Sequence, residues 1–336
     1  MSHATAVLQR HDDAEIPILD LAPYLAGRPA ALEELAVQLR YALQKVGFYF
    51  IKGHGVPQSL CDEVFEQAER FHAQPLDWKL KLTRNRDNVG YLPMTRAAGR
   101  DGEIKPNVNE AFFVKRDLPP DHPDVLARKR FRGTNLWPQD LPGFRESVVA
   151  YCDALEALAK KLVPIYAVAL DLPKDYFDKA FAEPQYTLRM SHYPFIEKLE
   201  PNEYGIAPHA DTSFMTLLAQ NKIPGLSLRT SDGRWIDAPA LEGHFLVNGG
   251  DMLRRWTNDR FLATPHRAIN RSGKERYAIP FFVDCNIEWP IECLSTCISV
   301  ERPARYPRFT YAEYMAAYQD MNLARDSADG VRMQAY

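Results

Sequence analysis

The second half of the chain is a series of short β-rich segments separated by turns, and this pattern is the strongest constraint on the fold. Seven segments between residues 186 and 284 carry it: YTLRMSHY, FMTLLAQ, GLSLRT, RWIDA, HFLVNGG, LATPHRAIN and RYAIPFFVD. Short strands repeated in this way, with turn residues between them, are typical of antiparallel sandwiches and barrels. We therefore expect residues 185–300 to form an antiparallel β core.

The first part of the chain has a different pattern, which predicts an α/β region followed by loops. Residues 31–46 repeat apolar side chains at helical spacing, and the β-rich run GFYFIKG follows them. Pro57 then opens a second amphipathic helix. Residues 84–142 are rich in Pro, Gly, Asn and Arg, and within them only NEAFFV resembles a strand. Long loops in a compact enzyme are often lids, so we expect a lid here.

Two further helices are predicted next to the β core. Residues 144–170 form a long helical pattern with one apolar stripe, which indicates a helix that packs against a sheet. Pro164 lies within it and should kink it. A final helix is expected from Tyr311 to Tyr318 or beyond, before a polar tail.

The composition is that of an ordinary folded protein, so we expect one domain over residues 1–336. Hydrophobic residues make up 46% of the chain and charged residues 25%, and the chain has no internal repeat or clear linker. We divide the domain into an N-terminal α/β region with loops, a backing helix, the β core, and a C-terminal helix and tail. These parts span residues 1–142, 143–170, 185–300 and 301–336.

Charge, hydropathy and cysteine content exclude several classes of protein. A net charge of −3 and a pI near 6.3 give no reason to expect a nucleic-acid partner. The chain contains no apolar run long enough for a transmembrane helix and no signal-peptide pattern at its start. Its five cysteines are an odd number without a C-x-x-C pair. We expect a cytoplasmic protein whose partner is a small-molecule substrate.

A histidine and an aspartate two positions apart are the first candidates for a metal site. His209 and Asp211 lie in APHADTS, just before the apolar run FMTLLAQ. On one strand, residues i and i+2 point to the same face, so both side chains would be buried together, which is costly without a partner such as a metal ion. His266, in ATPHRAIN, could return to the same site on a neighbouring strand. Two histidines and one carboxylate favour non-haem iron(II), and zinc is the competing assignment.

The segment ERYAIPFF places an arginine on a strand whose two faces both look buried. Arg276 would therefore need an anionic partner. Because its planar fork matches a carboxylate, we expect the ligand to be the carboxylate of a substrate or cosubstrate, with an internal salt bridge as the alternative. Tyr193, in RMSHYPF, could give its hydroxyl to the same carboxylate or could be a core residue.

Longer stretches of the chain resemble the isopenicillin N synthase-like family of iron(II)/2-oxoglutarate-dependent oxygenases. The matching segments are IPILDL, GFYFIKGHGV, GYLP, NEAFF, HYP, HADTSFMTLL, GRWIDAPALEGHFLVNGGDMLRRWTNDRF and TPHRAINRSGKERYAIPFF. The resemblance implies a mainly β fold with flanking helices, a double-stranded β-helix (jelly-roll) barrel with a long backing helix. It also implies that His209, Asp211 and His266 bind Fe(II), and that Arg276, with Tyr193 beside it, binds the distal carboxylate of 2-oxoglutarate.

An enzyme of this family is an oxidoreductase, a dioxygenase that consumes O₂ and 2-oxoglutarate and releases succinate and CO₂. The resemblance implies that this reaction is coupled to the hydroxylation, desaturation or cyclisation of a small organic substrate. Two motifs depart from the family pattern. The family usually has Arg-x-Ser where this chain has Ala278, and often Asn-x-Tyr where it has Ser191.

These departures keep one alternative open, an iron oxidase that uses O₂ without 2-oxoglutarate, with Arg276 binding a substrate carboxylate. A separate alternative is a metal-binding barrel without catalytic activity, against which the intact set of three ligands argues. Gln334 is a further feature, because isopenicillin N synthase carries a glutamine near its C-terminus that can occupy an iron position.

Overall fold

The computed structural model describes residues 16–94, 107–197, 199–200 and 202–328 of the chain. Gln334 and part of the expected lid, residues 95–106, lie outside the described residues. Among the helices that are described, none is long and apolar enough to cross a membrane.

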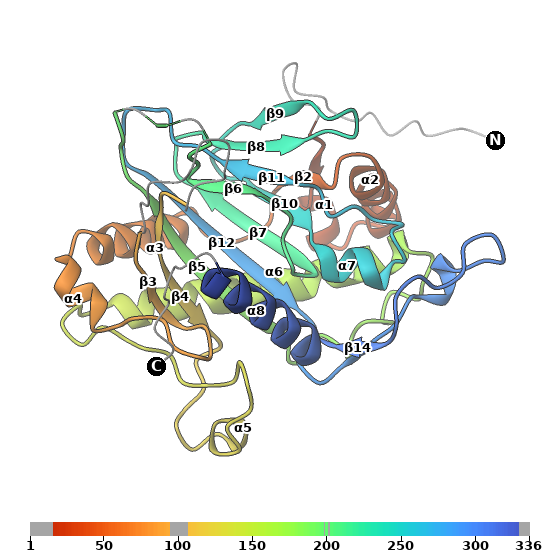
Figure 1. Cartoon of the computed structure of the whole chain (residues 1–336). Coiled ribbons are helices and arrows are strands. Elements are labelled where there is room, and N and C mark those ends of the chain that lie inside the picture. Colours follow the sequence, from red (N-terminus) through yellow and green to blue (C-terminus); the bar gives the residue numbers. More distant parts are fainter. Residues whose placement is uncertain (1–15, 95–106, 198, 201, 329–336) are drawn as a thin grey trace.

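An eight-stranded sheet is the central element of the structure (Figure 1). Its strand order is β1-β2-β10-β7-β12-β5-β4-β3, with β1 and β2 parallel and the other neighbours antiparallel. The strands are β1 (Ile18–Asp20), β2 (Phe48–Lys52), β3 (Gly90–Leu92), β4 (Glu110–Lys115), β5 (Gln185–Tyr193), β7 (Met215–Gln220), β10 (Phe245–Gly249) and β12 (Arg276–Asp284).

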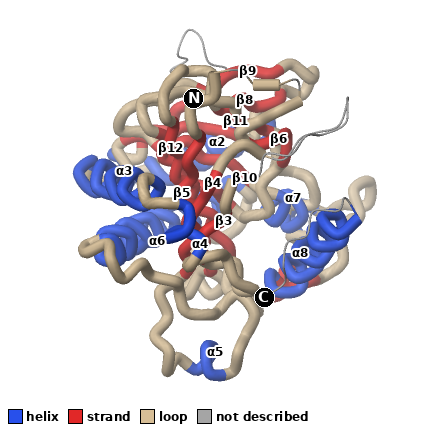
Figure 2. The backbone as a smooth tube through the Cα atoms, turned by 60° about the vertical axis from the view of Figure 1, so that its left-hand side comes forward, coloured by secondary structure: helices blue, strands red, loops and turns tan. Residues whose placement is uncertain are grey.

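A second, smaller sheet faces the large one and completes the expected antiparallel β core. Its strand order is β6-β11-β8-β9, and Figures 1 and 2 show it at the top of the molecule. A third sheet of two short strands lies near the C-terminal helix (Figure 1). The strands of these two sheets are β6 (Ile206–His209), β8 (Leu226–Arg229), β9 (Trp235–Ala238), β11 (His266–Ala268), β13 (Pro290–Ile291) and β14 (Phe309–Thr310).

Helices flank the strands of the large sheet on two sides. In Figure 2, α3 and α6 lie together on one side of the strands, while α7 and α8 lie on the other side. The described helices are α1 (Ala22–Leu25), α2 (Ala31–Lys45), α3 (Gln58–His72), α4 (Leu76–Leu80), α5 (Pro123–Leu126), α6 (Phe144–Ala169), α7 (Asp251–Trp256), α8 (Tyr311–Ala328) and the 3₁₀ turn η1 (Ser295–Cys297).

The apolar core has two parts, which lie on opposite faces of β12. Tyr277, Ile279 and Phe281 join the large cluster between the sheet and the helices. Ala278 joins the smaller cluster between the two sheets, which also contains Tyr193 of β5. Because successive residues on a strand point to opposite faces, each central strand contributes to both cores. The space between the two sheets is therefore lined by every second residue of β5 and β12.

The predicted elements are largely confirmed. The helix expected at residues 31–46 is α2, and the long helix is α6, which continues through Pro164. Pro57 is the residue before α3 rather than its first residue, with an extended backbone. The stretch 84–142, predicted as loops with one strand, also contains β3 and the short helix α5. The final helix extends beyond the predicted residues, over the whole of α8.

Candidate metal centre

The three predicted metal ligands converge at the edge of the small sheet. His209 is the last residue of β6 and His266 the first residue of β11, and the two are directly paired in the antiparallel register. The Nε2 atom of His209 lies 3.7 Å from Oδ1 of Asp211, and Nε2 of His266 lies 3.5 Å from the same oxygen. One ligand atom from each residue lies within 4.8 Å of the other two. These separations are short enough for one ion to bind all three residues.

The local reason for this convergence differs from the one expected from the sequence. His209 and Asp211 do not lie on one strand, because β6 ends at His209 and β7 begins at Met215. Asp211 lies in the connection that carries the chain from the small sheet to the large one. The expectation that strand alternation puts both side chains on one face was therefore wrong, although the two side chains do meet.

Hydrogen bonds to the backbone fix the orientation of both imidazoles. Nδ1 of His209 lies 2.8 Å from the carbonyl oxygen of Ala207, and Nδ1 of His266 lies 3.2 Å from that of Thr264. A carbonyl oxygen can only accept, so each Nδ1 carries a proton, and the neutral form of each imidazole presents a lone pair at Nε2. Burial lowers the pKa of His209 to about 4, which keeps its Nε2 unprotonated at neutral pH.

The carboxylate of Asp211 is oriented in the same way by donors from the large sheet. The Thr216 hydroxyl and the Asn248 amide donate to Oδ2 at 2.6 and 2.8 Å. Burial alone would raise the pKa of Asp211, but the neighbouring His266 and these donors lower it well below its usual range. Oδ1 is left facing the two histidines.

The donor set of this site fits a divalent metal ion. Two imidazole lone pairs and a carboxylate oxygen point at one another, an arrangement that is repulsive until a cation lies between them. Among the described residues, neither lysine nor arginine forms an ion pair with Asp211. Protein partners hold the second polar atom of every ligand, as is usual around bound metals. Two histidines and one carboxylate favour Fe(II).

Arg276 is buried between the sheets without an acidic partner among the described residues. It is 1% exposed, its Nε donates to the Ile223 carbonyl at 3.3 Å and its Nη2 to Gln220 at 3.2 Å. Its Nη1 is buried without a hydrogen-bond partner in the described part of the chain. The alternative of an internal salt bridge is therefore not what this structure shows, and the free nitrogen suits a carboxylate ligand.

Tyr193 lies beside this guanidinium. The two residues are paired across β5 and β12, and the guanidinium carbon of Arg276 lies 4.7 Å from the centroid of the Tyr193 ring. Gly225 gives Arg276 its room, since a Cβ atom there would lie 2.9 Å from the arginine Nε. Gly205 does the same for Tyr193, because a Cβ there would lie 2.7 Å from the ring.

Two further polar residues on the same face of β5 were not identified from the sequence as site residues. Ser191 is fully buried, its hydroxyl lacks a partner among the described residues, and it lies directly opposite Ala278. Arg189, two positions further along, extends the same row of polar side chains. Alternation counted back from Tyr193 could have found both residues.

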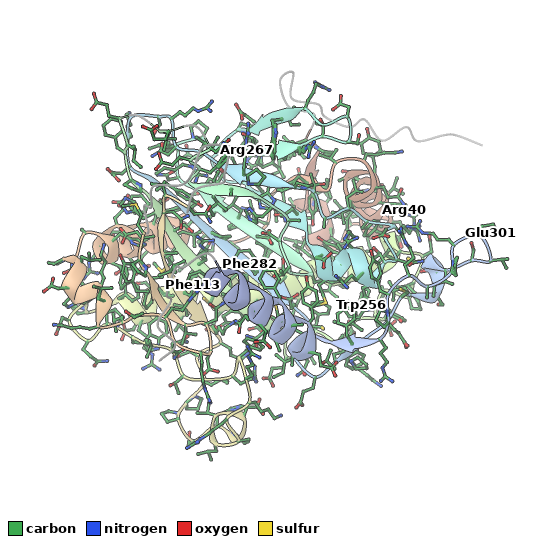
Figure 3. The ribbon with its side chains drawn as sticks, viewed as in Figure 1. Arg40, Phe113, Trp256, Arg267, Phe282 and Glu301 are labelled. Atoms are coloured by element: carbon green, nitrogen blue, oxygen red, sulfur yellow. The ribbon has the colours of Figure 1, made fainter. Side chains whose placement is uncertain are left out.

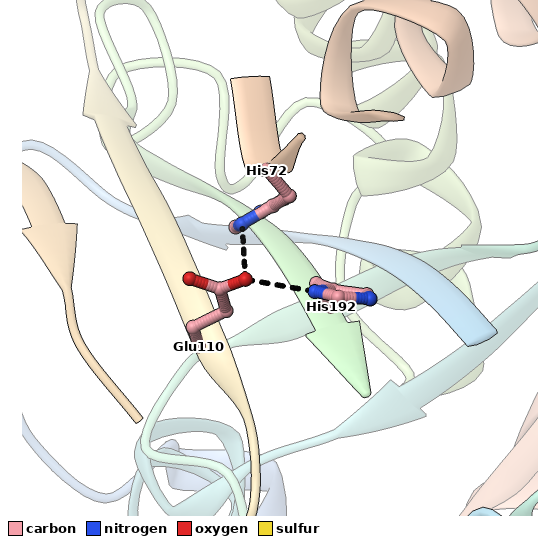
Figure 4. Close-up of side chains that lie close together, drawn as sticks. All are labelled: His72, Glu110 and His192. Carbon is pink, nitrogen blue, oxygen red and sulfur yellow. Dashed lines mark hydrogen bonds and ion pairs between the residues drawn. The ribbon is translucent and has the colours of Figure 1, made fainter. Parts of the chain in front are cut away.

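A second group of two histidines and a carboxylate lies on the helix side of the large sheet. Figure 4 shows Glu110 between His72 and His192, which come from β4, α3 and β5. Nδ1 of His192 lies 2.8 Å from Oε1 of Glu110, and Nδ1 of His72 lies 3.4 Å from it. Unlike Asp211, Glu110 also pairs with a protein cation, since Lys79 Nζ lies 2.7 Å from Oε2.

Comparisons with known proteins agree with this geometry. Residues 16–140 match the family described as non-haem dioxygenase in morphine synthesis N-terminal, and residues 184–284 match the 2OG-Fe(II) oxygenase superfamily. The 2-oxoglutarate-Fe(II) type oxidoreductase hxnY of Emericella nidulans is 33% identical over 320 residues, which cover 93% of this chain and 91% of that protein. Kihadalactone A synthase LFS of Citrus sinensis is 33% identical over 312 residues, 90% of this chain and 92% of that protein.

Solved structures give the same result for the fold. A full-length protein of Neurospora crassa, in complex with alpha-KG and thymine, superposes with a TM-score of 0.82 at 25% identity. The match covers 93% of this chain and 98% of that one. Two facing sheets with a His-Asp-His site at their edge define a non-haem iron oxygenase.

The chain belongs to the 2OG-Fe(II) oxygenase superfamily, in its isopenicillin N synthase-like branch. It is an oxidoreductase that uses Fe(II) and 2-oxoglutarate to oxidise small substrates. This membership favours the use of 2-oxoglutarate over the alternative that the departures at Ala278 and Ser191 left open, an oxidase without that cosubstrate. It also favours an enzyme over the separate alternative of a barrel without activity.

Proposed function

We propose that His209, Asp211 and His266 hold the iron(II) of this enzyme. The observation that supports the proposal is the convergence of two Nε2 atoms on one Asp211 oxygen, at 3.5 and 3.7 Å, with no protein cation paired to that oxygen among the described residues. Iron(II) bound there with 2-oxoglutarate supplies the activation of O₂ for oxidation of a substrate.

The protein contributes orientation and exclusion of water around this site. Thr216 and Asn248 fix one oxygen of Asp211, so that the other is aimed at the metal position. The edge of the Phe48 ring packs on His266, with ring centroids 5.3 Å apart, and shields it on that side. A rigid, partly apolar frame of this kind protects the reaction from bulk water.

We further propose that Arg276 and Tyr193 bind the distal carboxylate of 2-oxoglutarate. The unpartnered Nη1 of Arg276 supports this role, since a buried guanidinium nitrogen is costly to leave without an acceptor. Ser191 supports it as well, because its free hydroxyl lies across the strand pair from Ala278, where the family usually has a serine. In this proposal the hydroxyl has moved to the neighbouring strand and serves the same carboxylate.

The substrate in this proposal is a small organic molecule, and the outcome is hydroxylation, desaturation or cyclisation. We also propose that the enzyme works in the cytoplasm. Its cysteines, all five free and buried, support a reducing compartment. Fractionation of the producing cells, with the native chain followed by antibody, tests this location.

An anaerobic titration tests both assignments. Apoprotein with Fe(II) and 2-oxoglutarate should develop the weak visible charge-transfer band of the iron–2-oxo acid chelate. Arg276→Gln should keep iron binding but require at least about tenfold more 2-oxoglutarate for the band, because a charge-assisted pair is lost. Ser191→Ala should show a smaller shift in the same direction. Full band formation by Arg276→Gln at the wild-type concentration would contradict the cosubstrate assignment.

A further inference from the structure

We propose that Arg189 binds a carboxylate group of the primary substrate, so that the enzyme acts on a small organic acid. This inference rests on the proposed iron and 2-oxoglutarate sites and adds the substrate class to them. Arg189 lies on β5, on the same face as Ser191 and Tyr193, and therefore faces the space between the two sheets.

The guanidinium of Arg189 is held in place without an acidic partner. Its Nη2 donates to Oδ1 of Asn109 at 2.7 Å, and the Asn109 amide donates in turn to the Gly205 carbonyl. Because that donation fixes the amide, its oxygen faces the arginine. The Nε atom of Arg189 is buried without a hydrogen-bond partner, and among the described residues no carboxylate forms an ion pair with Arg189.

An aromatic ring completes the surroundings of Arg189. Phe113 of β4 is its cross-strand neighbour, and the guanidinium carbon lies 5.4 Å from the centroid of the ring, which Figure 3 labels. This contact orients the cation but does not neutralise it. The side chain remains partly exposed, so a ligand can reach it.

Arg189 lies beside the strand that carries a proposed iron ligand but away from the proposed cosubstrate arginine. Asn109, which accepts from Arg189, donates to the carbonyl of Gly205, and Gly205 immediately precedes β6, the strand that ends at His209. Arg276 pairs with Tyr193, four residues along β5, which separates the two backbone positions by roughly 13 Å. One carboxylate of 2-oxoglutarate can therefore be bound by Arg276 while Arg189 binds a different molecule.

The chemistry of the guanidinium indicates which substrate group it binds. Arg84 lies 5.4 Å from the same Phe113 ring, so the surroundings of Arg189 contain a second cation. Burying a charge without a counter-charge is costly, and a substrate carboxylate removes that cost. A planar fork also selects a carboxylate by geometry, through two parallel hydrogen bonds.

Matched acids and amides test the proposal on the full chain. The anaerobic Fe(II)–2-oxoglutarate complex is titrated with acetate, benzoate and phenylacetate, and with acetamide, benzamide and phenylacetamide. Shifts of the visible band report binding beside the iron. At least one acid should shift the band at a concentration about tenfold or more below its amide. A wild-type protein in which no acid does so overturns the proposal.

Variants test whether Arg189 is the residue that causes the preference for an acid over its matched amide. Arg189→Gln should weaken binding of the responding acid about tenfold or more and leave the amide unchanged, while Arg189→Lys should lie between, since it keeps the charge without the fork. Arg267→Gln is the matched control, because Arg267 stacks on Trp235 at 4.1 Å and belongs to neither proposed binding set (Figure 3). It should bind the acid like the wild type.

The outcomes separate the two levels of the proposal. The iron or cosubstrate assignment fails if the visible band forms unchanged in Asp211→Ala or in Arg276→Gln before any acid is added. Unchanged acid binding by Arg189→Gln overturns the role of Arg189 while the iron site stands. A variant that instead needs more 2-oxoglutarate to form the band also overturns it, because Arg189 would then serve the cosubstrate.

Discussion

Two groups of two histidines and one carboxylate lie on opposite sides of the large sheet in the described part of the chain, and they differ in how the carboxylate is balanced. Strand β5 contributes to both faces, with His192 on the helix side and Tyr193 beside it on the inner side. In the outer group, formed by His72, Glu110 and His192 on the helix side, Glu110 already accepts from Lys79 and from the Tyr91 hydroxyl. In the inner group, formed by His209, Asp211 and His266, Asp211 accepts from the Thr216 hydroxyl and the Asn248 amide, and no described lysine or arginine pairs with it.

This difference explains why similar residues serve different purposes. The group formed by His72, Glu110 and His192 carries its own cation, so the buried charges are compensated by the folded chain. The group formed by His209, Asp211 and His266 has no lysine or arginine paired with its carboxylate among the described residues, and in our proposal a bound metal ion supplies the missing positive charge. The residue types in a cluster therefore say less about metal binding than whether a lysine or arginine of the protein already pairs with its carboxylate.

Replacing a proposed iron ligand gives the largest expected effect and tests whether the inner group is the metal site. His209→Ala, Asp211→Ala and His266→Ala should each lower iron binding and succinate formation by more than about a hundredfold, since even indirect partners of a metal can cost 10–100-fold. The chain should stay folded. Metal analysis, turnover and circular dichroism check these results. Retained turnover in any two of the variants would contradict the assignment.

Substitution in the outer group should have the opposite result. Glu110→Gln leaves the Lys79 ammonium buried without its counter-charge, so the free energy of unfolding should fall by roughly 3 kcal/mol. Iron content should stay at the wild-type value, measured on the same preparation. An additional equivalent of metal bound by wild-type protein, and lost in Glu110→Gln, would show that the two groups are alike.

The same variant has a predicted pH dependence. Burial alone would raise the pKa of Glu110, but the donors and cations around it lower the pKa well below its usual range. A lowered folded-state pKa means that the stabilisation is present above about pH 4 and is lost as the pH falls below it. The stability difference between wild type and Glu110→Gln should shrink in acid. A difference that grows below about pH 4 would contradict the sign.

Much of this architecture follows from the sequence, because strand alternation and helical periodicity are local properties. The β-rich run RYAIPFFVD predicted β12, and the apolar stripe in residues 144–170 predicted α6. The inner site was proposed from His209, Asp211 and His266 and from the family resemblance. Its local geometry was not predictable, since it depends on a crossing between sheets after β6.

The outer group and Arg189 were not found from the sequence for a related reason. Glu110 meets His192 and Lys79 only because β4, β5 and α4 pack together, and the register of β4 against β5 is a tertiary property. Arg189 looks like any strand residue until its neighbours are known. Its missing counter-charge can be recognised only after the acidic residues have been placed.

A smaller effect is expected from reducing the room around the proposed cosubstrate arginine. In Gly225→Ala the new Cβ would lie 2.9 Å from Nε of Arg276 and 2.8 Å from the Ile269 carbonyl, so the arginine must shift. The KM for 2-oxoglutarate should rise about tenfold, because misplacing a binding group by a fraction of an ångström is costly. Iron affinity, measured in parallel, should not change. An unchanged KM would show that Arg276 does not bind the cosubstrate.

The smallest effect is expected at the exposed end of the outer group. Nε2 of His192 lies 2.6 Å from Oε2 of Glu275, whose side chain is 52% exposed, whereas the Glu110 side chain is 10% exposed. Water can replace a partner at the surface, so Glu275→Gln should lower the free energy of unfolding by less than about 1 kcal/mol. Denaturant unfolding of this variant beside Glu110→Gln measures the contrast. If both variants lost the same free energy of unfolding, burial would not determine how much each carboxylate contributes to stability.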